Sequence, residues 1–250
     1  MTDVTRAARA LSFGAASDAY DRYRPGPPAV VLDWLLPPGA GDVVDMGAGT
    51  GALTRHLVER VAHVTAVEPD PGMRRVLVRR APAATAVEGA AEALPVPDAS
   101  QDAVVGASMW HWVDPARAIP EIARVLRPGG RLGVLWAHPD REVEWVGELW
   151  AHLRAGQVPR GSGDRELVIA DGQGFAAPEG PHLVRFSVTL DRDDVLGLVT
   201  TYSGHIILSP EERAAQLRRV ADMLDAQPRF ASGEPVELPM VCRAWRAVRE

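Results

Sequence analysis

The chain has 250 residues, 46% of them hydrophobic, so it can bury one sizeable core. All 27 basic residues are arginine, and the formal net charge is −6. The absence of lysine excludes a P-loop lysine and a Schiff-base lysine, and the negative balance argues against a nucleic-acid partner. The single cysteine, Cys242, excludes an internal disulfide and a metal site built from cysteines.

Three helices are predicted within the first forty residues. Apolar spacing and proline positions favour helices over residues 4–11, 18–23 and 27–36, which could form a cap over a sheet. Strand and helix patterns then alternate, as is typical of a parallel sheet covered on both faces. The predicted strands are 41–45, 61–67, 84–88, 102–107 and 131–137, and the predicted helices between them are 50–61, 71–80 and 115–126.

The second half of the chain is less regular. Apolar spacing predicts helices over 142–155, 191–200 and 210–225. Strand patterns cover 183–190 and 235–248, the latter as a strand pair or one long edge strand. Residues 156–181 are rich in Gly, Pro and Ser, so we expect a loop there that could act as a substrate lid.

The most informative segment is the run DMGAGTG at residues 45–51. It lies between a predicted strand and a predicted helix, so the chain must turn sharply there. Glycine tolerates positive φ and lets a ligand lie against bare backbone, and the free N–H groups of the helix would point at that ligand. The turn alone is ambiguous, because Gly47, Gly49 and Ala52 also satisfy the loose dinucleotide fingerprint.

Two acids make the turn more specific. Glu68 ends the second predicted strand, where its carboxylate can accept hydrogen bonds from both hydroxyls of a ribose. Asp45 places a second acid at the end of the first strand. A nicotinamide-dependent oxidoreductase is one alternative, but it leaves Gly51 unexplained, and without lysine the chain has no Tyr-x-x-x-Lys dyad.

With these residues and the run LRPGG at 126–130, the chain resembles the class I S-adenosylmethionine (SAM) dependent methyltransferases. It is similar to a small-molecule group related to trans-aconitate methyltransferase and to the ubiquinone and menaquinone methyltransferases. The resemblance covers residues 13–137. It implies an α/β fold with a Rossmann-like, seven-stranded, mostly parallel sheet, helices on both faces and a helical N-terminal cap. It also implies SAM as methyl donor and S-adenosylhomocysteine as product.

The resemblance places the cofactor at the carboxyl edge of the sheet. The glycine turn would receive its methionine and ribose, and residues 88–95 its adenine edge. Many relatives carry Asp or Asn where this chain has Ala90, which leaves recognition there to Ala91 backbone, Glu92 or water. Tyr20 and Arg24 would close over the amino-acid end of the cofactor. The predicted cofactor-binding residues are Tyr20, Arg24, Asp45, Gly47, Ala48, Gly49, Gly51, Glu68, Pro69, Met73, Ala91, Glu92 and Ser108.

The predicted catalytic residues are two histidines. His111 follows the fourth predicted strand, where relatives have a similar aromatic-His-aromatic stretch, and it could remove a proton from the acceptor. Its alternative is a structural role between two tryptophans. His205 could assist His111 or simply lie in a loop. The other histidines and acids have no metal-ligand spacing, so we expect metal-free S_N2 transfer to an oxygen, nitrogen or carbon atom.

We expect one methyltransferase domain over residues 1–250, divided into a cap (1–40), a SAM-binding core (41–137) and an acceptor region (138–250). The expected acceptor is a small apolar or aromatic metabolite. The sequence has no apolar segment long enough to span a membrane, so we expect a cytoplasmic protein. We expect it to be monomeric or homodimeric. A second alternative is a SAM-binding protein of the same fold that is regulatory, or a cyclase or eliminase, and transfers no methyl group.

Overall fold

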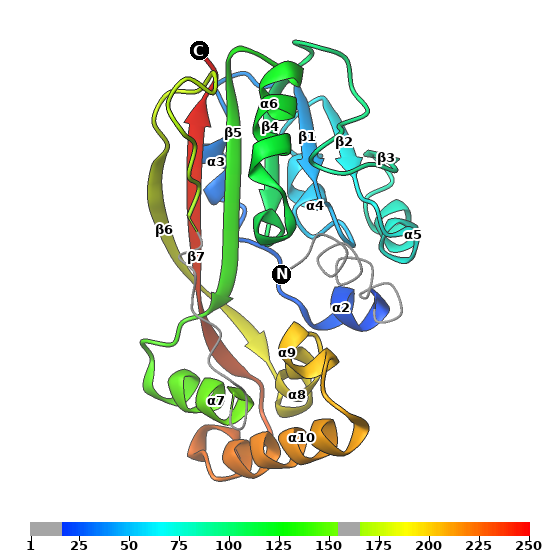
Figure 1. Cartoon of the computed structure of the whole chain (residues 1–250). Coiled ribbons are helices and arrows are strands. Elements are labelled where there is room, and N and C mark those ends of the chain that lie inside the picture. Colours follow the sequence, from blue (N-terminus) through cyan, green and yellow to red (C-terminus); the bar gives the residue numbers. More distant parts are fainter. Residues whose placement is uncertain (1–16, 155–165) are drawn as a thin grey trace.

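A computed structural model describes residues 17–154 and 166–250 (Figure 1). The helix expected over residues 4–11 lies outside them. The strands are β1 Asp42–Met46, β2 His63–Val67, β3 Thr85–Val87, β4 Gln101–Ala107, β5 Leu126–Pro139, β6 Glu179–Leu190 and β7 Val236–Val248. The helices are α2 Ser17–Tyr23, α3 Val31–Leu35, α4 Thr54–Leu57, α5 Pro71–Arg80, α6 Pro115–Val125, α7 Glu144–Arg154, α8 Arg192–Thr200, α9 Ser203–Ile206 and α10 Pro210–Asp225, with 3-10 turns at Trp110–Trp112 and Pro228–Phe230.

All seven strands form one sheet in the order β3-β2-β1-β4-β5-β7-β6. The pairs among β1 to β5 are parallel, and β7 runs antiparallel to both β5 and β6. The predicted Rossmann-like α/β fold with a mostly parallel seven-stranded sheet is therefore confirmed. The strand at 236–248 is one long strand inside the sheet, and the edge is formed by β6 instead.

Four elements differ in length from their predictions by four residues or more. The helix predicted over 27–36 is only α3, and the strand predicted over 183–190 begins earlier, at Glu179 of β6, inside the loop expected over 156–181. The helix predicted over 50–61 is only the short α4, because Gly51 has a φ of +91° and the residues before Thr54 are still turning. The strand predicted over 131–137 is longer at both ends. Its first residue, Leu126, already pairs with Gln101, and its last, Pro139, pairs with Met240 of β7.

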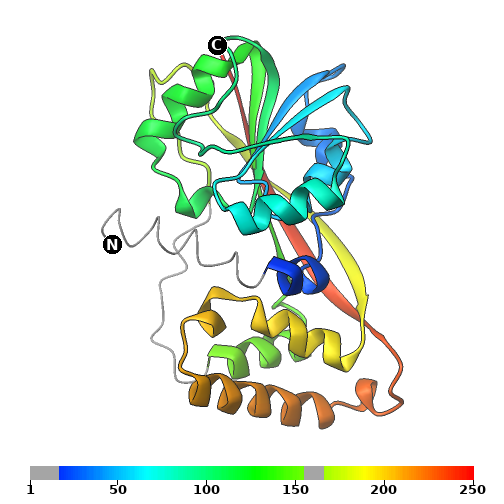
Figure 2. The same ribbon diagram turned by 90° about the vertical axis from the view of Figure 1, so that its right-hand side faces the viewer.

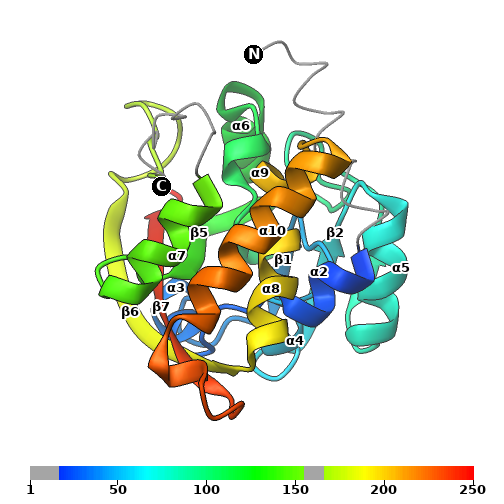
Figure 3. The ribbon, with the colours of Figure 1, turned by 90° about the horizontal axis from the view of Figure 1, so that it is seen from below.

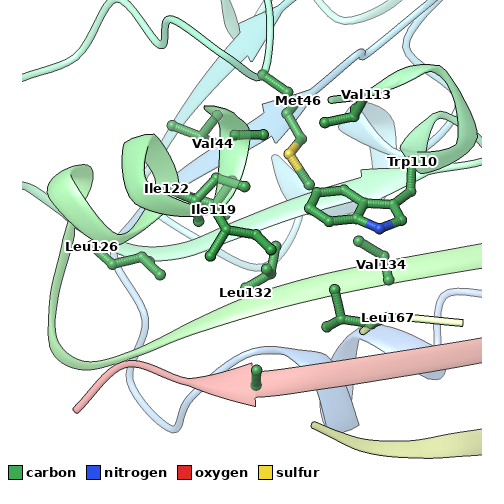
Figure 4. Close-up of a cluster of buried hydrophobic side chains, with 14 of the residues drawn as sticks. Val44, Met46, Trp110, Val113, Ile119, Ile122, Leu126, Leu132, Val134 and Leu167 are labelled. Carbon is green, nitrogen blue, oxygen red and sulfur yellow. The ribbon is translucent and has the colours of Figure 1, made fainter. Parts of the chain in front are cut away.

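The main core lies between the sheet and α6. Asp114 caps that helix by accepting a hydrogen bond from the Ala116 N–H (3.1 Å), and the buried face of α6 packs on β1, β4 and β5. Trp110 is 7% exposed, and its ring lies against Met46 and Val134 in this core (Figure 4). This tryptophan therefore has a structural role, which fixes the segment after β4.

A second core holds together a group of helices that we call the helical lobe, namely α7, α8, α9 and α10. Its buried residues come from α7, α8, α10, the turn Pro228–Phe230 and β7, and partly buried residues of β6 pack against them. The lobe lies beyond the carboxyl ends of the parallel strands (Figures 1 and 3). Helix α2 lies between the lobe and the sheet domain (Figure 2), with Tyr23 packed directly on Gly197 of α8. Within the described part of the chain, every helix is too short or too polar to cross a lipid bilayer.

Candidate active site

The turn after β1 has the backbone shape that its glycines suggest. Gly47, Gly49 and Gly51 have φ values of +63°, +58° and +91°, all in the left-handed region that favours glycine. The Ala48 N–H donates to the Val67 carbonyl (3.1 Å), which ties the turn to the end of β2. A Cβ atom added at Gly49 would meet nothing within 4 Å, so this residue faces open space.

Glu68 connects the turn to the next helix. Its Oε2 accepts a hydrogen bond from the Gly49 N–H (2.8 Å), and its Oε1 accepts one from the Asp70 N–H (2.9 Å). The side chain is 6% exposed, and this burial raises the pKa of Glu68, although the two backbone bonds oppose the shift. Each carboxylate oxygen accepts one backbone bond and retains a second lone pair for a ligand.

Asp45 is fully buried beside this carboxylate. Its Oδ2 accepts a hydrogen bond from the Thr54 hydroxyl (2.6 Å), whereas its Oδ1 is buried with no hydrogen-bond partner. Burial raises the pKa of Asp45 to about 7; the Thr54 bond opposes the shift and the charge of Glu68 adds to it. A buried oxygen without a hydrogen-bond partner costs free energy, so a hydrogen-bond donor or a cation at Asp45 Oδ1 would be favourable.

The segment after β4 approaches the turn from the other side. Ser108 has a φ of +57°, unusual for a residue other than glycine, and its N–H donates to the Leu135 carbonyl (2.8 Å). The Met109 side chain then lies over Gly47, where an added Cβ would come within 3.0 Å of it. Sequence reasoning chose Ser108 and missed Met109, because only the left-handed backbone turns that side chain onto the glycines.

The residues predicted for the adenine edge lie in the connection between β3 and β4 and in α5. Ala91 and Met73 are buried, at 4% and 5% exposure. Glu92 accepts a hydrogen bond from the Asp114 N–H (2.8 Å) and so holds the start of α6. Pro69 precedes Asp70, whose side chain caps α5. Glu92 therefore has a structural partner, and the contact of these residues with a ligand stays a prediction.

The predicted cap residues link α2 to the helical lobe. The Arg24 guanidinium lies 5.3 Å from the Tyr20 ring and 4.3 Å from the ring of Tyr202. Its Nε donates to the Thr201 hydroxyl (3.0 Å). Arg24 is thus held between two tyrosines by cation–π contacts, and its predicted ion pair with a cofactor carboxylate stays a prediction.

The two predicted catalytic histidines lie on different parts of the molecule. His111 is exposed in the turn after β4, with its ring 4.7 Å from that of Trp112. His205 is 5% exposed in α9, and its Nδ1 lies 2.6 Å from Gln216 Oε1. The Gln216 amide in turn donates to the Leu153 carbonyl (2.6 Å). His205 therefore joins three helices of the lobe, while His111 stays accessible.

Comparisons with known proteins agree with this geometry. Residues 44–134 match the family model for a methyltransferase domain. An uncharacterized methyltransferase of Mycobacterium tuberculosis is 44% identical over 239 residues, 95% of either chain. The chain belongs to the class I SAM-dependent methyltransferases. A solved structure from Anaeromyxobacter dehalogenans, described as a type II methyltransferase, superposes with a TM-score of 0.73 at 28% identity, covering 91% of this chain and 98% of that one.

A relative with a stated reaction matches only part of this methyltransferase. The malonyl-[acyl-carrier protein] O-methyltransferase of Methylococcus capsulatus is 38% identical over 133 residues, which are 49% of this chain and 48% of that protein. The shared methyl donor of the family is SAM. The narrower likeness to trans-aconitate and quinone methyltransferases stays a prediction.

The site of this methyltransferase fits SAM. Gly49 leaves room against bare backbone, the Glu68 carboxylate borders the turn, and Asp45 Oδ1 has no partner. One acid can accept hydrogen bonds from the ribose hydroxyls of such a ligand, and a second acid can pair with the ammonium group at its amino-acid end. Among residues 17–154 and 166–250, no three His, Cys, Asp or Glu side chains are grouped as metal ligands.

Proposed function

We propose that this methyltransferase transfers the methyl group of SAM to an oxygen, nitrogen or carbon atom of a small metabolite by metal-free S_N2 transfer. The observation that carries the proposal is the turn after β1, in which Gly49 faces open space while its N–H donates to Glu68 Oε2. Such a turn leaves a ligand in contact with backbone on one side and with a carboxylate on the other.

We assign the cofactor contacts to the residues around that turn. Glu68 accepts from the ribose hydroxyls, and Asp45 receives the ammonium group of the methionine moiety. Tyr20 and Arg24 lie at its carboxylate, and Ser108 borders it from the end of β4. The backbone contacts come from Gly47, Ala48, Gly49 and Gly51, and the adenine contacts from Pro69, Met73, Ala91 and Glu92.

Bound SAM supplies a methyl group on a positively charged sulfur, so the protein mainly has to align the two reactants and exclude water. We assign to His111 the removal of a proton from the acceptor, because this side chain is accessible beside the end of β4. His205 is a second candidate. The Gln216 amide nitrogen donates to the Leu153 carbonyl, so Gln216 Oε1 faces His205 Nδ1. We therefore assign the ring hydrogen of neutral His205 to Nδ1, which leaves Nε2 as a hydrogen-bond acceptor.

Replacing Glu68 with alanine should weaken SAM binding by about 2–4 kcal/mol, because two charge-assisted hydrogen bonds to the ligand are lost. The measurement is isothermal titration of the wild type and the variant with SAM, S-adenosylhomocysteine and NAD(H). We expect the wild type to bind SAM and S-adenosylhomocysteine and not NAD(H). Binding of NAD(H) alone would favour an oxidoreductase instead.

The matched control for this variant is Glu179→Ala. Glu179 is an exposed acid at the start of β6, the sheet edge opposite β2 and β3, and it pairs with Arg246 (2.8 Å), so its loss should leave affinity unchanged. Thermal unfolding of both variants shows whether the folded state survives. Equal affinities for Glu68→Ala and the wild type would remove Glu68 from the site.

Replacing His111 with glutamine should lower turnover at least tenfold and leave the affinity for S-adenosylhomocysteine unchanged, because general-base catalysis contributes roughly 10²–10⁴-fold. Turnover is followed as S-adenosylhomocysteine release with an acceptor found by screening. His63→Gln is the control, since His63 is exposed at the start of β2 and pairs with Asp42. If both variants turn over like the wild type, His111 is a structural residue.

A further inference from the structure

A chain of alternating arginine and aromatic side chains extends from the cap into the helical lobe. Beyond the contact of Arg24 with Tyr202, the Tyr202 ring packs edge-on against Trp150, with ring centres 5.0 Å apart. Arg141 lies 4.8 Å from the Trp150 ring, and Arg154 lies 5.6 Å from it. We call Arg24, Arg141, Arg154, Trp150 and Tyr202 the arginine–aromatic cluster.

The cluster carries positive charge that no acid among the described residues neutralises. Elsewhere in the same region arginines are paired, as Arg185 is with Asp140 and Glu142. Within the two described stretches of chain, no carboxylate forms an ion pair with the guanidinium groups of the cluster. Partial desolvation of its guanidinium, with the charges of Arg154 and Arg243, lowers the pKa of Arg141, although the residue as a whole is exposed. An anion placed there would remove this repulsion.

The cluster lies on the side of the helical lobe where the sheet ends. The Ser108 N–H donates to the Leu135 carbonyl at the carboxyl edge, and Arg141 follows six residues later along the chain, just past the end of β5. Arg24 belongs to the segment after α2, which lies between the lobe and the sheet domain (Figure 2). Arg141 is itself exposed, so a small molecule can reach it. This is the side from which an acceptor would approach the methyl donor in the proposed function.

We propose that the acceptor is an organic acid whose carboxylate is bound by Arg141, with Arg154 adding positive charge and Trp150 and Tyr202 contacting its apolar part. The planar guanidinium matches a carboxylate with two parallel hydrogen bonds. Its position over an indole face keeps that fork oriented without an acidic neighbour. The inference rests on the proposed function and narrows it, since sequence patterns indicated only an apolar or aromatic metabolite.

The test is calorimetric titration of the protein saturated with S-adenosylhomocysteine. The probes are benzoate, phenylacetate and cinnamate, each compared with its neutral amide, and inorganic phosphate as a separate arm. We expect at least one acid to bind the wild type about tenfold or more tightly than its amide, because a charged hydrogen-bond pair has that effect on affinity. The variant Arg141→Gln should bind the acid and the amide alike.

The control is Arg229→Gln. Arg229 also lies over a tryptophan of the lobe, 4.8 Å from the Trp145 ring, but in the 3-10 turn Pro228–Phe230 at the far end of α10. This variant should keep the preference for the acid. Binding of S-adenosylhomocysteine without any acid preference in the wild type, or an unchanged preference in Arg141→Gln, would overturn the inference and leave the proposed function standing. Phosphate binding more tightly than every acid would overturn the carboxylate assignment, and failure to bind S-adenosylhomocysteine would overturn the proposed function itself.

Discussion

Replacing Gly49 with leucine is expected to weaken SAM binding more than a hundredfold while leaving the protein folded. A Cβ atom at this position meets no protein atom within 4 Å, so the new side chain would enter the space that we assign to the cofactor. The φ of +58° strains any residue other than glycine, at a cost of about 1–2 kcal/mol. That strain is small against the loss of ligand contacts, because binding requires close approach to bare backbone.

Gly129→Leu is the matched control for this variant. Gly129 has a φ of +79°, and a Cβ there also meets nothing within 4 Å, but the residue lies at the amino end of β5, away from the turn. Both variants should lose similar stability in urea unfolding, and only Gly49→Leu should lose affinity in titration with S-adenosylhomocysteine. Equal affinities in the two variants would place the cofactor elsewhere.

Sequence periodicity was sufficient for the elements whose cause is local. Helix α5 spans the predicted residues because Asp70 caps it and Pro71 begins it, and α10 begins at Pro210 for the same reason, with Ser209 and Glu212 forming a capping box. The lengths of α4 and β5 could not be read in this way. They depend on the left-handed Gly51 and on hydrogen bonds to strands distant in sequence.

The same distinction holds in the candidate site. Glu68 and the glycine turn were recognisable because their spacing follows from one strand, one turn and one helix. The arginine–aromatic cluster was not recognisable, since Arg24, Arg141 and Tyr202 are far apart in sequence and meet only through tertiary packing. His205, which was expected to assist His111 or to lie in a loop, lies in the short helix α9, and its contact with Gln216 also depends on tertiary packing.

Asp45, a residue of the candidate site, should also make the free energy of unfolding depend on pH. Its carboxyl has a pKa of about 7 in the folded protein against 3.8 ordinarily, because it is fully buried. The folded state therefore holds a proton that the unfolded chain releases between these values. The favourable contribution is fully present below pH ~3.8 and is lost as the pH rises through 7, a change of up to about 4 kcal/mol. Burial also raises the pKa of Glu68, so that residue adds to the same trend.

Asp45→Asn should consequently be more stable than the wild type at pH 8 and should lose less free energy of unfolding between pH 5 and pH 8. The amide carries no charge to desolvate, and its oxygen can still accept a hydrogen bond from the Thr54 hydroxyl. Urea unfolding at a series of pH values measures the difference, with Asp33→Asn as the control because Asp33 is largely exposed in α3.

Asp45→Asn should also bind SAM more weakly, since the ammonium group of the ligand is expected to pair with the ionised carboxylate. Parallel pH curves for Asp45→Asn and the wild type would mean that Asp45 ionises normally, and the asparagine variant binding SAM as tightly as the wild type would place the ammonium group elsewhere.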